Sequence, residues 1–202
     1  MTKIKLCGLS RLCDIEAANE LKPEYIGFVF YKKSKRYVTP KKAKELKQIL
    51  DPEIKAVGVF VNEKPEKVSE LLNDGIIDIA QLHGSENEDY INKLRNLSDK
   101  PIIKAFRIET ASDIERAKQS IADDILLDSG AGTGMVFNWE LIQNIKRPYF
   151  LAGGLGIDNV KNAVNLLHPY AIDVSSGIET DGLKDKYKMS ALVAAIRKED
   201  RL

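Results

Sequence analysis

Two side chains at the ends of short apolar segments have the chemistry to move protons on a substrate. Cys7 closes residues 3–7, where lysines and Cys7 alternate with apolar residues, and Asp128 closes residues 125–128. A thiolate and a carboxyl group that face each other across a cavity suit a general base and a general acid. Lys5 is predicted to lie on the same face as Cys7, where it would favour the thiolate.

Each of these two residues has an ordinary explanation when it is taken alone. A free cysteine is usually a small buried hydrophobe, and Asp128 could simply order the glycine-rich stretch that follows it. Lysines alternating along the inner face of a first strand do not fit an apolar core, but they fit a strand that lines a polar cavity. The position of Cys7 and Asp128 at the ends of two predicted strands favours the catalytic interpretation.

Three further polar residues are candidates for substrate binding. Arg36 lies in the basic stretch 31–37, and its planar guanidinium group suits a carboxylate, whereas the lysines of this stretch are expected to be solvated charges. His83 follows a predicted strand, but it is a lone histidine without a second ligand that would indicate a metal. Asp173 lies inside the last predicted strand, where a buried carboxylate needs a partner, either a substrate hydroxyl or Lys5.

The elements that must position these residues alternate between strand and helix along the whole chain. Strands are predicted at residues 3–7, 25–30, 55–61, 77–82, 101–106, 125–128, 149–152 and 171–174. Helices are predicted at residues 14–21, 40–50, 64–72, 86–94, 112–120, 139–145, 158–167 and 188–197. This pattern predicts the α/β class and one (β/α)8 TIM barrel domain over residues 1–202, with its active site at the carboxyl ends of the strands. An open doubly wound sheet is the alternative, but it has fewer strands and gives no reason for polar residues inside the first one.

Two turns rich in glycine and serine are candidates for phosphate binding. They are Gly153-Gly154 and Ser175-Ser176-Gly177, after the seventh and eighth predicted strands. Their glycines let backbone N–H groups approach an anion, and their serines add hydroxyl donors. Either turn alone could be only a tight connection, but both occupy the positions at which such barrels bind phosphate.

A third glycine-rich stretch, residues 130–134, lacks the lysine and hydroxyl pair of a nucleotide-binding loop. We interpret it as a loop that gates the substrate.

Composition excludes several other classes of function. The 202 residues are 44% hydrophobic and 30% charged, and a net charge of +1 gives no electrostatic case for nucleic acid or membrane surfaces. No apolar run is long enough to span a bilayer, and lysines interrupt any signal-peptide core near the N-terminus. A cytoplasmic location is therefore expected, with Cys7 and Cys13 as free thiols.

Taken together, the motifs resemble phosphoribosylanthranilate isomerase, an enzyme family of tryptophan biosynthesis. The resemblance covers essentially the whole chain in order. It rests on Lys5-Leu6-Cys7-Gly8, Gly27-Phe28-Val29-Phe30-Tyr31 with Ser34 to Arg36, Val57-Gly58-Val59-Phe60-Val61-Asn62, Gln81-Leu82-His83-Gly84, Leu126-Leu127-Asp128, Gly132-Thr133-Gly134, Phe137-Asn138-Trp139, Gly153-Gly154-Leu155 and Asp173-Val174-Ser175-Ser176-Gly177-Ile178-Glu179.

The resemblance implies an Amadori rearrangement of N-(5-phosphoribosyl)anthranilate without metal or organic cofactor, by a monomer or a homodimer. It implies that Asp128 is the general acid and Cys7 the general base. Arg36 would hold the anthranilate carboxylate, and His83 and Asp173 would line the pocket. The glycine- and serine-rich turns after the seventh and eighth strands would hold the phosphate.

Two other functions remain open at this point. A related sugar-phosphate isomerase of histidine biosynthesis would be expected to carry an aspartate where this chain has Cys7. A catalytically silent barrel could bind phosphorylated ligands as a sensor, although the presence of both Cys7 and Asp128 disfavours it.

Overall fold

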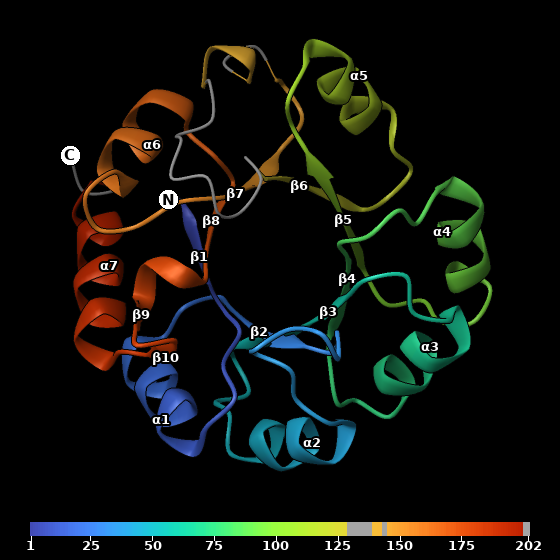
Figure 1. Cartoon of the computed structure of the whole chain (residues 1–202), viewed down its shortest axis with the longest axis horizontal. Coiled ribbons are helices and arrows are strands. Elements are labelled where there is room, and N and C mark those ends of the chain that lie inside the picture. Colours follow the sequence, from blue (N-terminus) through green and yellow to red (C-terminus); the bar gives the residue numbers. More distant parts are fainter. Residues whose placement is uncertain (129–138, 143–144, 200–202) are drawn as a thin grey trace.

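The computed structural model describes residues 1–128, 139–142 and 145–199, and its eight parallel strands close into a barrel in sequence order (Figure 1). The barrel closes because β1 pairs with β8, with Lys5 opposite Asp173. This closure confirms the predicted (β/α)8 barrel and excludes the doubly wound sheet. The strands are β1 (Lys3–Cys7), β2 (Tyr25–Val29), β3 (Lys55–Phe60), β4 (Ile79–Leu82), β5 (Ile102–Arg107), β6 (Asp124–Asp128), β7 (Tyr149–Ala152) and β8 (Ala171–Val174).

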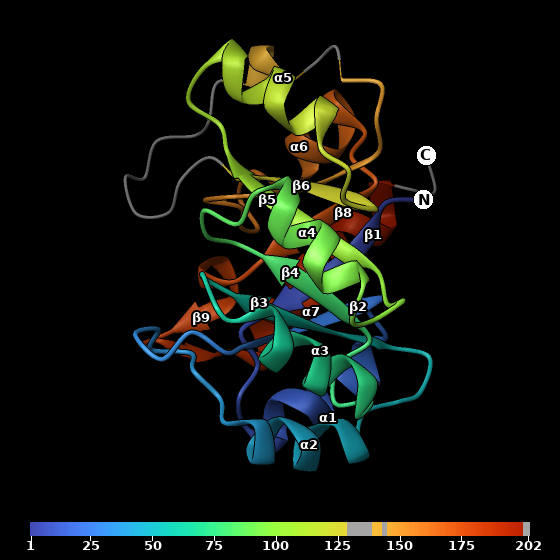
Figure 2. The same cartoon turned by 90° about the vertical axis from the view of Figure 1, so that its right-hand side faces the viewer.

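Helices surround the barrel wall, as the side view shows (Figure 2). They are α1 (Leu12–Leu21), α2 (Pro40–Gln48), α3 (Pro65–Asn73), α4 (Glu88–Arg95), α5 (Ala111–Gln119), α6 (Val160–Leu167) and α7 (Lys186–Glu199). Local signals fix several helix starts: Thr39 Oγ1 accepts the Lys42 N–H, and Pro40 occupies the first helical position, where its missing N–H costs no hydrogen bond. Among the described residues, no helix is long and apolar enough to cross a membrane.

The barrel interior changes character from its N-terminal to its C-terminal end. Near the N-terminal ends of the strands, Lys3 Nζ bonds to the hydroxyl of Tyr170 and lies over its ring, and Tyr25 packs against Phe150. Above this layer the interior becomes polar, beginning with the buried side chain of Lys5. The apolar lower layers therefore form the floor beneath a polar upper end.

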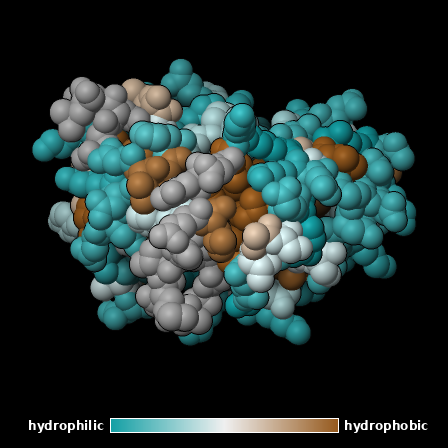
Figure 3. All heavy atoms as spheres, turned by 90° about the horizontal axis from the view of Figure 1, so that it is seen from above, coloured by the Kyte–Doolittle hydropathy of each residue, from teal (hydrophilic) through white to brown (hydrophobic). Residues whose placement is uncertain are grey.

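One flank of the barrel combines hydrophilic and hydrophobic surface (Figure 3). Figure 3 looks at the flank that carries α5 and α6, where hydrophobic residues gather in a central patch and teal, hydrophilic residues cover most of the rest.

The segment after β6 is one part of the chain that differs from the sequence-based expectation. In the described part of the helix predicted over residues 139–145, Trp139–Leu141 form a 3-10 turn, η1, and the Ile145 N–H donates to the Ile142 carbonyl oxygen. Bonds of this i to i+3 type are typical of short connectors. The predicted gating loop, residues 130–134, lies outside the described residues.

A short hairpin after β8 was not predicted at all. It follows the 3-10 turn η2 (Ser176–Ile178) and consists of β9 (Glu179–Thr180) and β10 (Leu183–Lys184). Its turn residues Asp181 and Gly182 have φ values of 52° and 77°, as a tight type I′ hairpin turn requires.

A buried ion pair between Lys104 and Glu86 stabilises the loop between β4 and α4. Lys104 Nζ lies 3.3 Å from Glu86 Oε2 and also donates to the carbonyl oxygens of Leu82 and Gly84. Glu86 in turn accepts the backbone N–H groups of Asn62 and Gly84. Both side chains are buried, so each charge depends on the other for most of its stabilisation.

We expect Glu86→Ala to lower the free energy of unfolding by about 3–5 kcal/mol, because it leaves Lys104 buried without its counter-charge. Urea denaturation would measure this. The matched control is Glu115→Ala, which removes the exposed partner of Lys118 and should cost no more than about 0.5 kcal/mol. Equal effects of the two substitutions would contradict the structural role of Glu86.

Candidate active site

The centre of the site is a buried ion pair between the first and last strands. Lys5 Nζ lies 2.8 Å from Asp173 Oδ2, and the two side chains are 0% and 7% exposed. Burial alone would lower the pKa of Lys5, but the charges and hydrogen bonds of Asp173 and Cys7 together outweigh it and raise that pKa. Of the two partners proposed for Asp173, Lys5 is present. Within the described part of the chain, Asp173 Oδ1 is buried and has no hydrogen-bond partner, so one carboxylate oxygen is left unpaired.

Cys7 lies two residues above Lys5 on the same face of β1. It is buried and packs with Val29 and Val59. Gly27 on the neighbouring strand makes room for it, because a Cβ at Gly27 would stand only 2.5 Å from the Cys7 sulfur. The side chains of Val29 and Val59 and the backbone of Gly27 therefore fix the position of the Cys7 thiol.

Burial raises the pKa of the Cys7 thiol above its ordinary value. Lys5 acts in the opposite direction and favours the thiolate, whereas Asp173 disfavours it. The predicted influence of Lys5 thus has the expected sign, but desolvation is the larger effect. Because the pKa of Cys7 is raised, its thiolate is a stronger base for removing a substrate proton than the thiolate of an ordinary cysteine.

The second predicted catalytic residue, Asp128, lies at the end of β6 beside His83. His83 Nε2 and Asp128 Oδ2 are 3.2 Å apart, and His83 Nδ1 is 2.9 Å from Gln81 Nε2. With Gln81 donating to Nδ1, the imidazole carries its proton on Nε2 and donates it to Asp128. The sequence analysis placed His83 at the carboxyl end of a strand but did not predict its contact with Asp128. It did not identify Gln81 as a site residue, although Gln81 lies two residues before His83 and contacts it.

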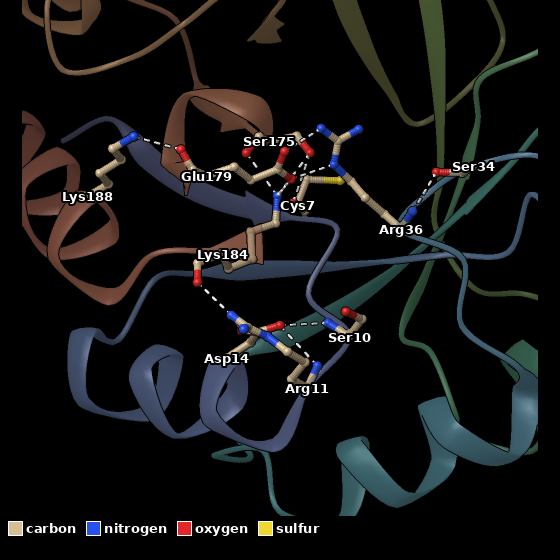
Figure 4. A network of polar contacts seen from close by, with 10 residues as sticks. All are labelled: Cys7, Ser10, Arg11, Asp14, Ser34, Arg36, Ser175, Glu179, Lys184 and Lys188. Carbon is tan, nitrogen blue, oxygen red and sulfur yellow. Dashed lines mark hydrogen bonds and ion pairs between the residues drawn. The ribbon is translucent and has the colours of Figure 1, made fainter. Parts of the chain in front are cut away.

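Arg36 lies over Gly8 and is already engaged by a carboxylate of the chain. Its Nε and Nη2 donate to the two carboxylate oxygens of Glu179 at 2.5 and 2.7 Å (Figure 4). Lys184 Nζ reaches the same carboxylate and also donates to the carbonyl and hydroxyl oxygens of Ser175. Glu179 and Lys184 were not singled out as site residues, since the hairpin that carries them was not predicted.

The two predicted phosphate turns come together at one cavity of about 350 Å³. Gly154, Ser176 and Gly177 line it, whereas Gly153 and Ser175 do not. The closest approach is between Gly177 and the carbonyl of Leu155, where a Cβ on Gly177 would be 2.0 Å from the oxygen. The remaining lining residues are Leu155, Gly156, Ile157, Asp158, Asn159 and Lys188.

The cavity also lies at the start of a helix. Asn159, the residue before α6, bonds through its side chain to the N–H of Gly156 and the carbonyl of Gly154, which fixes the turn after β7. Lys188 contributes a positive charge that the sequence analysis missed. In the described residues there is no group of three or more histidine, cysteine or acidic side chains that could hold a metal ion.

Comparison with known proteins gives one consistent result. The family model for N-(5'phosphoribosyl)anthranilate (PRA) isomerase matches residues 4–195. The N-(5'-phosphoribosyl)anthranilate isomerase of Clostridium acetobutylicum is 46% identical over 98% of this chain and 99% of its own length. That of a Thermoanaerobacter species is 44% identical over 98% of both chains.

Solved structures agree with the sequence relatives. The crystal structure of phosphoribosyl anthranilate isomerase from Thermotoga maritima has a TM-score of 0.90 and 35% identity, covering 98% of this chain and all of that one. A phosphoribosyl anthranilate isomerase in complex with reduced 1-(o-carboxyphenylamino)-1-deoxyribulose 5-phosphate has a TM-score of 0.88 and 35% identity, with the same coverage. By sequence along nearly its full length and by the barrel that carries Cys7 and Asp128, this chain belongs to the N-(5'-phosphoribosyl)anthranilate isomerase family.

Proposed function

We propose that this protein converts N-(5-phosphoribosyl)anthranilate to 1-(2-carboxyphenylamino)-1-deoxyribulose 5-phosphate, in tryptophan biosynthesis. The observation that carries the proposal is the placement of Cys7 and Asp128 at the carboxyl ends of β1 and β6, in a chain that matches this isomerase family from residue 4 to residue 195. The cytoplasmic location and the choice between monomer and homodimer stay predictions; a solved structure from Thermotoga maritima concerns a dimeric enzyme of the family.

In the first step, Asp128 acts as the general acid. It protonates the ring oxygen of the ribose, the C1–O bond breaks, and the nitrogen lone pair forms a Schiff base. In the second step, the Cys7 thiolate removes the proton from C2, and the electron pair moves onto the nitrogen to give an enolamine. The enolamine then tautomerises to the ketone. An aldose-to-ketose shift of this kind needs an acid and a base at different places around the sugar, which two separate strands of one barrel can supply.

Three other residues support this assignment by their geometry. The open Oδ1 of Asp173 is available to accept a hydrogen bond from a ribose hydroxyl. His83 contacts Asp128 and is placed to orient it. Arg36 would bind the anthranilate carboxylate with the guanidinium edge that Glu179 leaves open.

The phosphate would occupy the cavity between the turns after β7 and β8. Gly154, Ser176 and Gly177 line this cavity and would offer backbone N–H groups to the phosphate, the helix α6 begins beside it, and Lys188 adds a positive charge. Gly153 and Ser175 belong to the two turns but do not line the cavity, so we assign them a role in shaping the turns and not in contacting the phosphate.

We expect Cys7→Ser and Asp128→Asn each to lower kcat by about 10²- to 10⁴-fold, the usual contribution of a positioned acid or base. KM should change little, because neither side chain is assigned to ground-state binding. The measurement is the loss of anthranilate-derivative fluorescence when the enzyme meets substrate generated in situ. If both variants isomerise at the wild-type rate, the acid–base assignment is wrong and a silent, ligand-binding barrel becomes the better description.

We expect two substitutions at the ion pair to move the pKa of Cys7 in opposite directions. Lys5→Met removes the cation that favours the thiolate and should raise this pKa, whereas Asp173→Asn removes the opposing anion and should lower it. Because the thiolate is the species that reacts, the pH profile of iodoacetamide alkylation reports both shifts. Lys3→Met, at the other end of the strand, is the control and should leave the profile in place. A profile that does not move in either ion-pair variant would contradict the influence of Lys5 and Asp173.

We expect Gly177→Ala to raise KM for the substrate about tenfold or more, because its Cβ would collide with the carbonyl of Leu155 and push the two phosphate turns apart. Gly156→Ala is the matched control in the same cavity, since a Cβ there meets nothing closer than 3.8 Å. Steady-state kinetics and displacement by inorganic phosphate would measure the difference. Similar KM values for Gly177→Ala and the wild type would place the phosphate elsewhere.

A further inference from the structure

The least explained buried charge near the site is Lys184, on β10 of the short hairpin. Its side chain is only 3% exposed. Its ammonium group makes three contacts: to the carbonyl oxygen of Ser175 at 2.8 Å, to the hydroxyl of Ser175 at 3.2 Å, and to Glu179 Oε1 at 2.5 Å. An ammonium group has three hydrogens, so these contacts use all of them. Lys184 has no donor left for a substrate and acts through its neighbours.

One of these neighbours, Glu179, holds one side of the Arg36 guanidinium group. The bonds from Nε and Nη2 occupy the lateral edge of the group (Figure 4). A guanidinium group has five N–H donors, so Nη1 and the outer hydrogen of Nη2 form a second edge. In the part of the chain that the structure describes, no hydrogen bond from Nη1 is recorded, and Arg36 is 32% exposed. This second edge has the geometry to receive another carboxylate in a bidentate pair.

Lys184 also ties the same network to the strand that carries Cys7. The hydroxyl of Ser175 donates to the Cys7 carbonyl oxygen at 3.1 Å while it accepts from Lys184. From the other side, Arg11 donates to the carbonyl oxygen of Lys184. The hairpin is therefore held against the end of β1 and cannot shift without moving Arg36.

The charges of the cluster also favour a second anion. Burial opposes the ionised form of Glu179, but the hydrogen bonds from Arg36 and Lys184 outweigh it and lower the pKa of this carboxyl group. Glu179 is therefore ionised and neutralises only one of two cations. With the Cys7 thiol neutral, the five charged groups around it carry one positive charge in excess: Lys5 from β1, Arg36 from the loop after β2, Asp173 from β8, Glu179 from β9 and Lys184 from β10.

We propose that Lys184 and Glu179 are positioning residues that determine recognition of the substrate carboxylate. Lys184 fixes Glu179, Glu179 fixes the lateral edge of Arg36, and the free edge of Arg36 is thereby held ready for the carboxylate of the anthranilate ring. This rests on the proposed function, in which Arg36 binds that carboxylate. A fixed arginine saves the entropy that a free side chain would lose on binding.

The test compares two competitive inhibitors that differ only in the carboxylate. One is reduced 1-(o-carboxyphenylamino)-1-deoxyribulose 5-phosphate, and the other is the corresponding phenylamino compound without the carboxylate. The wild type should prefer the first by about tenfold or more. In Lys184→Met and in Glu179→Asp this preference should fall by about 3- to 10-fold, while binding of the compound without the carboxylate stays within about twofold of wild type.

Glu179→Asp is the decisive variant because it keeps the negative charge but shortens the side chain by one methylene group. It therefore tests positioning apart from charge, and it serves alone if Lys184→Met does not fold. Lys186→Met, which removes an exposed lysine paired with Glu20, is the control and should keep the full preference. Equal weakening of both inhibitors would reduce Lys184 and Glu179 to a general structural role and overturn the proposal. A preference that rises in Glu179→Asp would make Glu179 a competitor of the substrate and would also overturn it.

Arg36→Met separates this proposal from the one on which it rests. If Arg36→Met abolishes the preference but Glu179→Asp and Lys184→Met retain it, the carboxylate site is correct and only the positioning role is wrong. If Arg36→Met keeps the preference, the assignment of Arg36 itself is wrong.

Discussion

The ion pair between Lys5 and Asp173 is the interaction on which the active end of this barrel depends. A charge buried without a partner would cost several kcal/mol, so β1 and β8 can each bury their charged residue only when they lie side by side. The same pair that closes the barrel lies directly below Cys7 and sets the electrostatic field at its sulfur. The pairing of β1 with β8 that closes the barrel therefore also brings together the two charges that shift the pKa of Cys7.

Two opposing effects decide the character of Cys7. Burial among Val29 and Val59 stabilises the neutral thiol, while nearby cations stabilise the thiolate. Cys7 is therefore ionised less often than an ordinary cysteine, but its thiolate is a stronger base, which suits removal of a weakly acidic proton from carbon. The carboxylates of Asp173 and Glu179 keep the surrounding cations in fixed places without neutralising them all.

The parts of the site that follow from local alternation could be predicted from the sequence, and the parts that depend on distant contacts could not. The inward face of β1 was predictable, because alternation fixes which side chains share a face. Lys5 was one of the two partners expected for Asp173, and the structure shows this pair. The pairing of Arg36 with Glu179 joins residues from opposite ends of the chain, and no periodicity reports such a contact. The hairpin that carries Glu179 did have a signal, the Asp181-Gly182 pair, but strands of two residues are too short for alternation to reveal. The helix predicted after β6 was wrong in its described part, where Trp139–Leu141 form a 3-10 turn.

The parallel pairing of β1 with β8 also has a consequence for folding. Residues that meet in this ladder, such as Lys5 and Asp173, are separated by 168 positions in the chain, so the loop that closes the barrel is among its longest. Until β8 arrives, β1 is an edge strand with unpaired backbone groups, which is where chains tend to aggregate. Lysines on an edge strand discourage pairing with another chain. In a barrel that lacks β8, the two lysines of β1 would therefore disfavour pairing with another chain, and Lys5 gains its partner Asp173 only with the last strand in place.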